Sequence, residues 1–155
     1  MIPSILLIED NPGDSELVTE ALKEITGEIS IVIAGDGERG LQVLRGMAYN
    51  HELPDLVICN FNLPKLTGAQ VLAEVKRDET LKNVPFIMLT SSARDTDRQA
   101  CAGAKAYLIK GSTWKDTRAI AKQIVEFLPP AKMTKLKPDQ WPSAALAEEE
   151  KIGIS

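Results

Sequence analysis

The chain has 155 residues, of which 44% are hydrophobic and 26% are charged, a size and composition that suit one soluble globular domain. Its formal net charge of −4 argues against a basic surface for nucleic acid. The apolar run near the N-terminus is too short for a signal peptide or a membrane span, so we expect a cytoplasmic protein with no membrane or nucleic-acid partner.

Two kinds of apolar pattern alternate along the chain. Short runs rich in β-branched residues predict five strands, at residues 5–8, 29–35, 55–59, 84–89 and 106–110. Apolar residues at three- and four-residue spacing predict helices at about 17–25, 41–48, 71–75 and 119–128, with a short polar helix at 95–102. Asp14 or Ser15 is expected to cap the first helix, Gly27 to end it, and Pro129-Pro130 to stop the last helix.

Five strand–helix units with short connections predict an α/β fold, a flavodoxin-like doubly wound sheet of five parallel strands with helices on both faces. Right-handed crossovers favour the strand order 2-1-3-4-5. We assign residues 1–129 to this domain. Residues 130–155 are assigned to a Pro-rich C-terminal tail that is too short for a core of its own, and whose Trp141 is a candidate for docking onto the domain or a partner.

Polar residues follow four of the predicted strands, at the sheet edge where such folds bind ligands. They are Glu9 and Asp10 after the first strand, Asn60 and Asn62 after the third, Thr90, Ser91 and Ser92 after the fourth, and Lys110 after the fifth. Adjacent acids can hold Mg²⁺, and a lysine and a hydroxyl can contact phosphoryl oxygens. The pattern is that of phosphoryl transfer to a carboxylate, except that position 60 carries an amide.

The remaining candidates for metal or redox chemistry have simpler interpretations. Cys59 and Cys101 are far apart in the sequence and have no ligand spacing, which favours buried free thiols. His51 stands in a polar segment without a second His or Cys near it, which favours a surface histidine.

Four segments together resemble the CheY-like receiver domain of two-component response regulators: ILLIEDNPGD, PDLVICNFNLPKLTG, VPFIMLTSS and GAKAYLIKG. The resemblance covers roughly residues 4–128. The stretches EDNPGDSELVTEALKE and DGERGLQVLRG are most similar to the small single-domain regulators that partner phytochrome-type histidine kinases.

The resemblance implies a role for each residue at the strand ends. Glu9 and Asp10 match the Mg²⁺-binding acids, and the backbone carbonyl of Asn62 joins the metal shell. Thr90 matches the hydroxyl that reports phosphorylation, Lys110 the phosphate-contacting lysine, and Tyr107 the aromatic switch. Asn60 takes the place of the phospho-accepting aspartate.

An amide at position 60 changes the expected chemistry. Asn60 has no anionic oxygen, so it cannot form the acyl phosphate, and Mg²⁺ should bind more weakly to the two remaining acids. Its N–H₂ group is expected to donate to a carboxylate and partly replace the cation.

Other positions also depart from the family pattern. Gly111 replaces the usual proline after Lys110, which makes a cis peptide bond improbable. The loop after the fifth strand can then direct the Lys110 side chain differently from the family pattern. The segment from Thr90 to Tyr107 is about two residues short, so the fourth helix is expected to be shortened or irregular. Thr67 replaces a common aspartate, a change expected to be neutral.

These observations favour an atypical single-domain receiver, which is a signalling module and not an enzyme. The expected partners are a histidine kinase, another signalling protein, or a second copy bound through the fourth helix, fifth strand, fifth helix and tail. One alternative is an ordinary phosphorelay receiver whose acceptor was mutated to Asn60. A more distant alternative is a flavodoxin-like nucleotide or flavin binder, although no Gly-rich phosphate loop follows the first strand.

Overall fold

The computed structural model describes residues 1–133. Strands and helices alternate along this part of the chain. In order they are β1 (Ser4–Ile8), α1 (Pro12–Thr26), β2 (Ser30–Ala34), α2 (Gly37–Tyr49), β3 (Leu56–Cys59), α3 (Gly68–Arg77), β4 (Phe86–Thr90), α4 (Asp95–Ala100), β5 (Ala106–Ile109) and α5 (Trp114–Ile124), followed by the 3₁₀ turns η1 (Val125–Phe127) and η2 (Pro130–Lys132).

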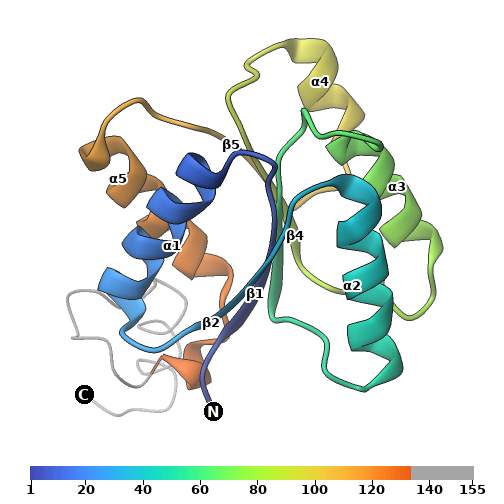
Figure 1. Ribbon diagram of the computed structural model, residues 1–155, viewed down its shortest axis with the longest axis horizontal. Coiled ribbons are helices and arrows are strands. Elements are labelled where there is room, and N and C mark those ends of the chain that lie inside the picture. Colours follow the sequence, from blue (N-terminus) through green and yellow to red (C-terminus); the bar gives the residue numbers. More distant parts are fainter. Residues whose placement is uncertain (134–155) are drawn as a thin grey trace, which may run out of the picture.

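The five strands form one parallel sheet in the order β2-β1-β3-β4-β5, which confirms the predicted fold and strand order (Figure 1). Strand β1 pairs with β2 and β3, so that Ile5 lies beside Ile31 on one side and Leu56 on the other. All four residues of β3 and all five of β4 are buried, as expected for strands covered on both faces.

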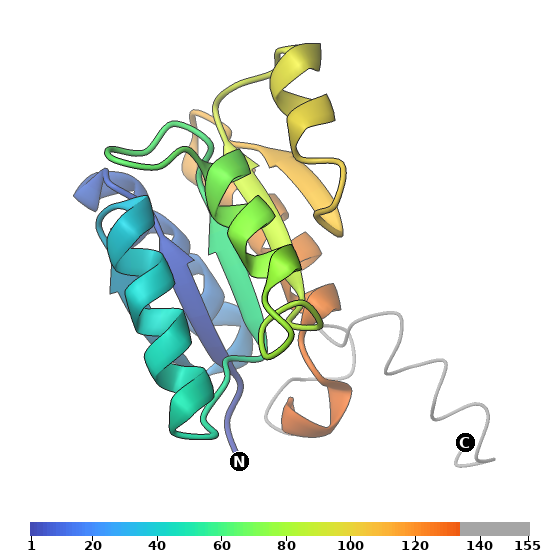
Figure 2. The ribbon, with the colours of Figure 1, turned by 90° about the vertical axis from the view of Figure 1, so that its right-hand side faces the viewer.

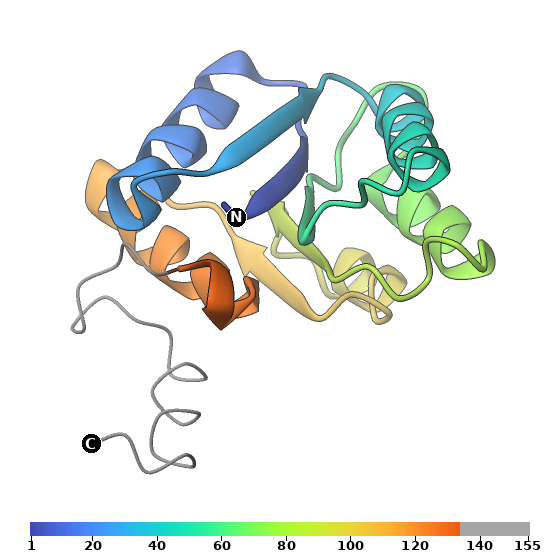
Figure 3. The same cartoon turned by 90° about the horizontal axis from the view of Figure 1, so that it is seen from below.

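Helices cover the sheet in two layers, with α1 and α5 on one face and α2 and α3 on the other (Figures 1 and 3). The alternation of side chains along each strand divides the core accordingly. In β1, Ile5 and Leu7 belong to the core beneath α1 and α5, whereas Leu6 and Ile8 belong to the core beneath α2 and α3. Both cores reach the strand ends that carry the candidate site.

Helix α4 is the exception among the helices. It has only six residues, none of them buried, and no side chain caps its N-terminus, which confirms the expectation of a shortened fourth helix. Figure 2 shows it beyond the end of α3, and every residue of the neighbouring edge strand β5 is only partly buried. The face formed by α4 and β5 is therefore thinly covered, although the other edge strand, β2, has more exposed residues.

The start of α1 corrects one prediction. The cap is Asn11, whose side chain accepts a hydrogen bond from the backbone N–H of Asp14, and Pro12 occupies the first helical position. Proline suits that position because its missing N–H has no partner in the first turn anyway. Neither Asp14 nor Ser15 is the cap, and the Asp14 side chain is left available for another contact. Gly27 ends the helix with φ 76°, as predicted.

The chain after α5 stays on the domain as far as it is described. Turn η1 follows Ile124, and the two prolines then lead into η2. Met133 is buried in the core beneath α1 and α5, so the assignment of residue 129 as the domain limit stays a prediction. Trp141 lies outside the described residues. Within residues 1–133 no helix has the length and apolar character needed to cross a membrane.

Candidate functional site

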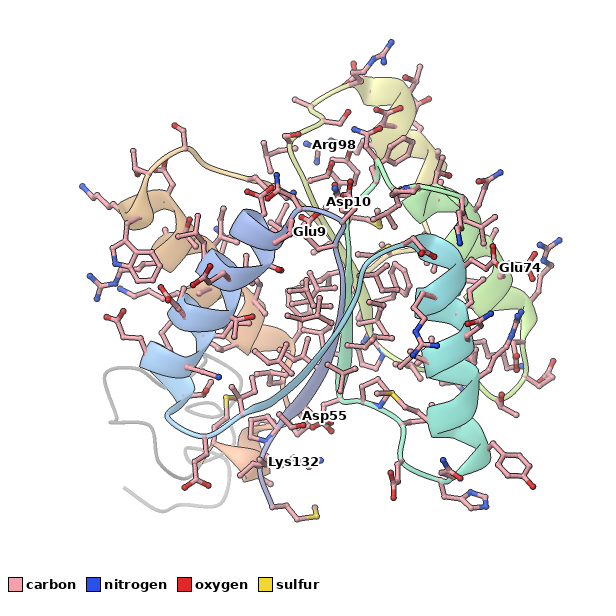
Figure 4. The ribbon with its side chains drawn as sticks, viewed as in Figure 1. Glu9, Asp10, Asp55, Glu74, Arg98 and Lys132 are labelled. Carbon is pink, nitrogen blue, oxygen red and sulfur yellow. The ribbon has the colours of Figure 1, made fainter. Side chains whose placement is uncertain are left out.

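The site lies at the carboxyl ends of β1 and β3, where Glu9 and Asp10 are grouped (Figure 4). These strands are paired up to Ile8 and Cys59, and the backbone N–H of Asn60 donates to the carbonyl of Ile8 at 3.0 Å. The pairing continues one residue beyond β3 and thereby fixes Asn60 next to the acidic pair.

The loop after β3 closes tightly over its own start. A Cβ atom at Gly68 would lie 2.3 Å from the backbone oxygen of Asn60, so only glycine fits there. The side chain of Thr67 caps α3 in a capping box with Gln70. The residue that departs from the family pattern at position 67 therefore has a clear local role, which is to start α3 at the edge of the site.

The amide nitrogen of Asn60 lies where three oxygen atoms converge. It is 3.1 Å from Oε2 of Glu9, 3.5 Å from Oδ1 of Asp10 and 3.3 Å from the backbone oxygen of Asn62. Asn60 is only 8% exposed. The expectation that this amide donates to a carboxylate is confirmed, and the same nitrogen also reaches the carbonyl predicted to join the metal shell.

Lys110 reaches the acidic pair from the other side. Its ammonium group donates to Oε1 of Glu9 and, at 2.8 Å, to Oδ2 of Asp14. The Lys110–Gly111 peptide bond is trans, like every peptide bond in the described residues. A Cβ atom at Gly111 would lie 2.1 Å from the side chain of Asp116, so glycine gives room to the acid that completes the capping box of Thr113 at the start of α5.

The two ends of the Lys110–Glu9 pair respond differently to burial. Burial raises the pKa of Glu9, and this outweighs the opposing effect of the Lys110 hydrogen bond and charge. Burial acts to lower the pKa of Lys110, but the hydrogen bonds and charges of Asp14 and Glu9 are stronger together and raise it. Lys110 is therefore firmly held as a cation.

Thr90 and Tyr107 form a second group that is linked through the backbone of Ser92. The buried Thr90 hydroxyl accepts from the N–H of Ser92 at 3.2 Å, and the Tyr107 hydroxyl donates to the carbonyl of Ser92 at 2.8 Å. The guanidinium of Arg98 lies over the Tyr107 ring, 4.8 Å from its centre. Burial raises the pKa of Tyr107, so its hydroxyl stays protonated and able to donate.

Two residues of the site are not identified by the sequence patterns. Asp14 is expected there only as a helix cap, and Ser92 only as one of several polar residues after β4. The position of Asp14 in the first turn of α1, one turn after Asp10, is a signal that could have drawn attention to it. The role of Ser92 is carried by its backbone, which no residue type reveals.

The arrangement offers oxygen ligands to a divalent cation, with an amide nitrogen among them. Glu9, Asp10 and the Asn62 carbonyl supply oxygen atoms of the kind Mg²⁺ prefers, and they already converge on one point. At that point, however, lies an N–H₂ group, which a cation would have to displace. No group of three or more His, Cys, Asp or Glu side chains in the described part of the chain is arranged to hold a metal. The two other candidate ligands, Cys59 and Cys101, are buried free thiols as predicted.

Known proteins of one family are similar to this chain in sequence. Residues 5–122 match the family described as "Response regulator receiver domain". Response regulator Rcp1 of Synechocystis sp. is 36% identical over 127 residues, which cover 79% of this chain and 86% of Rcp1. The probable methanogenesis regulatory protein FilR2 of Methanothrix harundinacea is 34% identical over 128 residues, which cover 79% of this chain and 81% of FilR2.

Solved structures of two response regulators are also similar. The phosphorylated cyanobacterial phytochrome response regulator RcpA has a TM-score of 0.75 at 34% identity, covering 83% of this chain and 99% of RcpA. The Mn²⁺-bound form of Rcp1 has a TM-score of 0.71 at 31% identity, covering 91% of this chain and 99% of that structure. The chain therefore belongs to the response regulator receiver domain family, close to the regulators Rcp1 and RcpA.

Proposed function

We propose that this protein is an atypical single-domain response regulator of two-component signal transduction that acts by binding other proteins and is not phosphorylated at Asn60. The observation that carries the proposal is the amide of Asn60, the residue predicted to stand at the acceptor position, whose nitrogen is turned toward Glu9, Asp10 and the Asn62 carbonyl. Phosphoryl transfer to a side chain needs a nucleophilic oxygen there, and an amide does not provide one.

Several donors of the protein itself hold the carboxylate of Glu9. Glu9 accepts from Lys110 through one carboxylate oxygen and from Asn60 through the other, and the second oxygen also accepts from the backbone N–H of Asn11 at 3.3 Å. The acids thus have partners that hold the loop after β3 in place. Such a domain can keep one conformation and present one surface to its partner.

Mg²⁺, if bound, would be held by Glu9, Asp10 and the backbone oxygen of Asn62, with Asn60 adding its amide oxygen after a rotation of the side chain. A divalent cation supplies charge neutralisation at such a site. We propose that this binding is weak, because one carboxylate of the usual three is missing and the amide N–H₂ group competes for the same oxygens.

The similarity to Rcp1 and RcpA supports a histidine kinase, and among kinases a phytochrome-type one, as a partner; another signalling protein is the alternative. The partly exposed β5, with Tyr107 at its centre, and the thinly packed α4 support the face of α4, β5 and α5 as the contact surface, including contact with a second copy. We further propose that the protein has no enzymatic activity of its own and works in the cytoplasm.

A second candidate function is that of an ordinary phosphorelay receiver whose aspartate was exchanged for Asn60. It is favoured by the convergence of Glu9, Asp10 and Lys110, which leaves most of a phosphorylation site in place. The residue encoded at position 60 of the parent gene distinguishes this candidate from a naturally altered receiver.

The test treats the protein and its Asn60→Asp variant with acetyl phosphate and Mg²⁺ and records the intact mass. We expect no phosphate adduct on the unchanged protein, and Asn60→Ala serves as a control for transfer to other side chains. An adduct on the unchanged protein that is absent from Asn60→Ala would overturn the proposal. An adduct on Asn60→Asp alone would support it and show that the rest of the site is functional.

A further inference from the structure

Lys110 is held by a carboxylate that belongs to a different element from the acidic pair. Besides Glu9, its ammonium contacts Asp14 in the first turn of α1, with 2.8 Å between Nζ and Oδ2. Among residues 1–133 no hydrogen bond joins Lys110 to Asn60. The lysine thus bonds to Glu9 and to an acid of α1.

Both ends of this ion pair are fixed by the backbone. The N–H of Asp14 donates to the cap Asn11 at 3.1 Å, which orients the first turn of α1. The N–H of Lys110 donates to the carbonyl of Thr90 at 2.9 Å, which extends the pairing of β4 and β5. The ion pair therefore joins two rigid elements that are 96 residues apart in the sequence.

The surroundings of the ion pair differ between its two members. The Lys110 side chain is 14% exposed, whereas that of Asp14 is 38% exposed and stands at the rim. The two residues line a small pocket between α1 and α5 together with Leu17, Val18 and Ile120. Apolar side chains line the pocket beside the lysine, and the charged partners of its ammonium are Glu9 and Asp14.

We propose that Asp14 is a positioning residue, which draws the Lys110 ammonium onto Glu9 and away from position 60. The inference rests on the proposed function, since it describes the same site. It has two consequences. The acidic pair keeps a resident cation, and a phosphoryl group arriving at residue 60 must compete with Asp14 for the lysine.

The first experiment measures how firmly the Lys110 amine is held by its partners and does not depend on phosphorylation. The protein is treated with limiting acetic anhydride, and acetylation of Lys110 is followed by peptide mass mapping. Asp14→Asn should increase the acetylation rate of Lys110 by about three- to tenfold, because the amine loses one of its two charged hydrogen-bond partners and is less firmly held in the ion pair.

Two variants make this result specific. Glu16→Gln removes the same charge from an exposed position of α1 and should leave the rate unchanged. Asp14→Glu restores a carboxylate and should return the rate most of the way to that of the unchanged protein. Equal rates in the unchanged protein and Asp14→Asn, or equal increases in Asp14→Asn and Glu16→Gln, would overturn the proposal.

The second experiment places Asp14→Asn in the Asn60→Asp background and follows phosphorylation by acetyl phosphate. In this reaction a carboxylate oxygen of the aspartate introduced at position 60 forms a bond to phosphorus, while acetate leaves with the electron pair of the broken P–O bond. We expect the double variant to react severalfold faster than Asn60→Asp, whereas adding Glu16→Gln has no such effect. If neither variant is phosphorylated, the remaining residues of the site do not support phosphoryl transfer to an aspartate at position 60. The acetylation rates then still decide the role of Asp14.

Discussion

Replacing the amide nitrogen of Asn60 by oxygen would bring three carboxylates together at one strand end. Asn60→Asp should therefore lower the free energy of unfolding in chelator by about 1–3 kcal/mol, because a donor to Glu9 and Asp10 becomes a third acceptor. Added Mg²⁺ should restore stability in this variant and affect the unchanged protein less. Urea unfolding with EDTA and with Mg²⁺ measures both effects.

The control for this exchange is Asn62→Asp, which adds the same charge two residues away on an exposed side chain. Its stability should depend little on Mg²⁺, because Asn62 contacts the amide of Asn60 through its backbone oxygen and not through its side chain. If Asn60→Asp and the unchanged protein respond equally to Mg²⁺, the amide is not acting in place of a cation.

Glu9 gives the site a dependence on pH. Its pKa lies above the ordinary value of 4.5 because it is buried, so in the interval above 4.5 the folded protein binds more protons than the unfolded chain. The favourable contribution of this group is present at low pH and is lost as the pH rises through the folded-state pKa. Glu9→Gln stays neutral, and its stability relative to the unchanged protein should therefore increase as the pH rises from about 4 toward 7.

Paired urea titrations at several pH values measure this difference. Glu16→Gln is the matched control, because it makes the same exchange at an exposed position of α1. A constant difference between Glu9→Gln and the unchanged protein across the range would show that burial does not dominate the ionisation of Glu9.

At the scale of the element, two glycines of α2 differ in the space available for a side chain. A Cβ atom at Gly40 would lie 2.5 Å from the side chain of Ile8, whereas nothing lies within 4 Å of such an atom at Gly46. Gly40→Ala should thus destabilise the protein by about 1–3 kcal/mol through overpacking at the end of β1. Gly46→Ala should stabilise it by about 0.5–1 kcal/mol, since alanine is the better helix former.

Thermal and urea unfolding of the two variants test this contrast, and each serves as the control for the other. The same exchange in the same helix leaves only the local surroundings to explain a difference in sign. Equal effects would mean that α2 can shift away from β1 and that Gly40 does not set their distance.

The elements show how far the sequence alone can lead. Apolar periodicity locates all five strands and the helices, and the handedness of the connections then predicts the strand order. The start of α1 is harder to predict because Asn11, Asp14 and Ser15 are all good capping residues, and only the position of Pro12 separates them. The expectation that helix α4 is short is confirmed, because few residues separate Thr90 from Tyr107 and they limit the length of any helix between β4 and β5.

The candidate site is predictable in its members and less so in their contacts. The strand ends bring Glu9, Asp10, Asn60 and Lys110 together as expected. The contact of Lys110 with Asp14 depends on how α1 packs beside the loop after β5, and residues 96 positions apart give no sign of that contact in the sequence. The link from Thr90 to Tyr107 runs through backbone atoms, which side-chain patterns do not show.

At the scale of the whole molecule, charged contacts hold both ends of the sheet. Glu9 and Asp10 mark the carboxyl end, while Asp55 and Lys132 meet at the opposite end (Figure 4). There the Lys132 ammonium lies 2.8 and 3.0 Å from the two oxygens of Asp55, and the backbone N–H of Ser4 donates to the same carboxylate at 2.8 Å. One carboxylate thus connects the start of β1, the start of β3 and the turn that follows α5.

This second contact predicts a stabilising role for the segment beyond α5. Lys132→Met should lower the free energy of unfolding by about 1–3 kcal/mol, because Asp55 is only 12% exposed and would lose its charged partner. Urea unfolding measures the loss, and Lys122→Met, which changes an exposed lysine of α5, should change stability by less than about 0.5 kcal/mol.

Asp55→Asn combined with Lys132→Met completes a double-mutant cycle, and a coupling near zero would show that η2 is held by the burial of Met133 alone. A coupling free energy of about 1 kcal/mol or more would show that the folded domain extends beyond residue 129, to the turn that carries Lys132 or further.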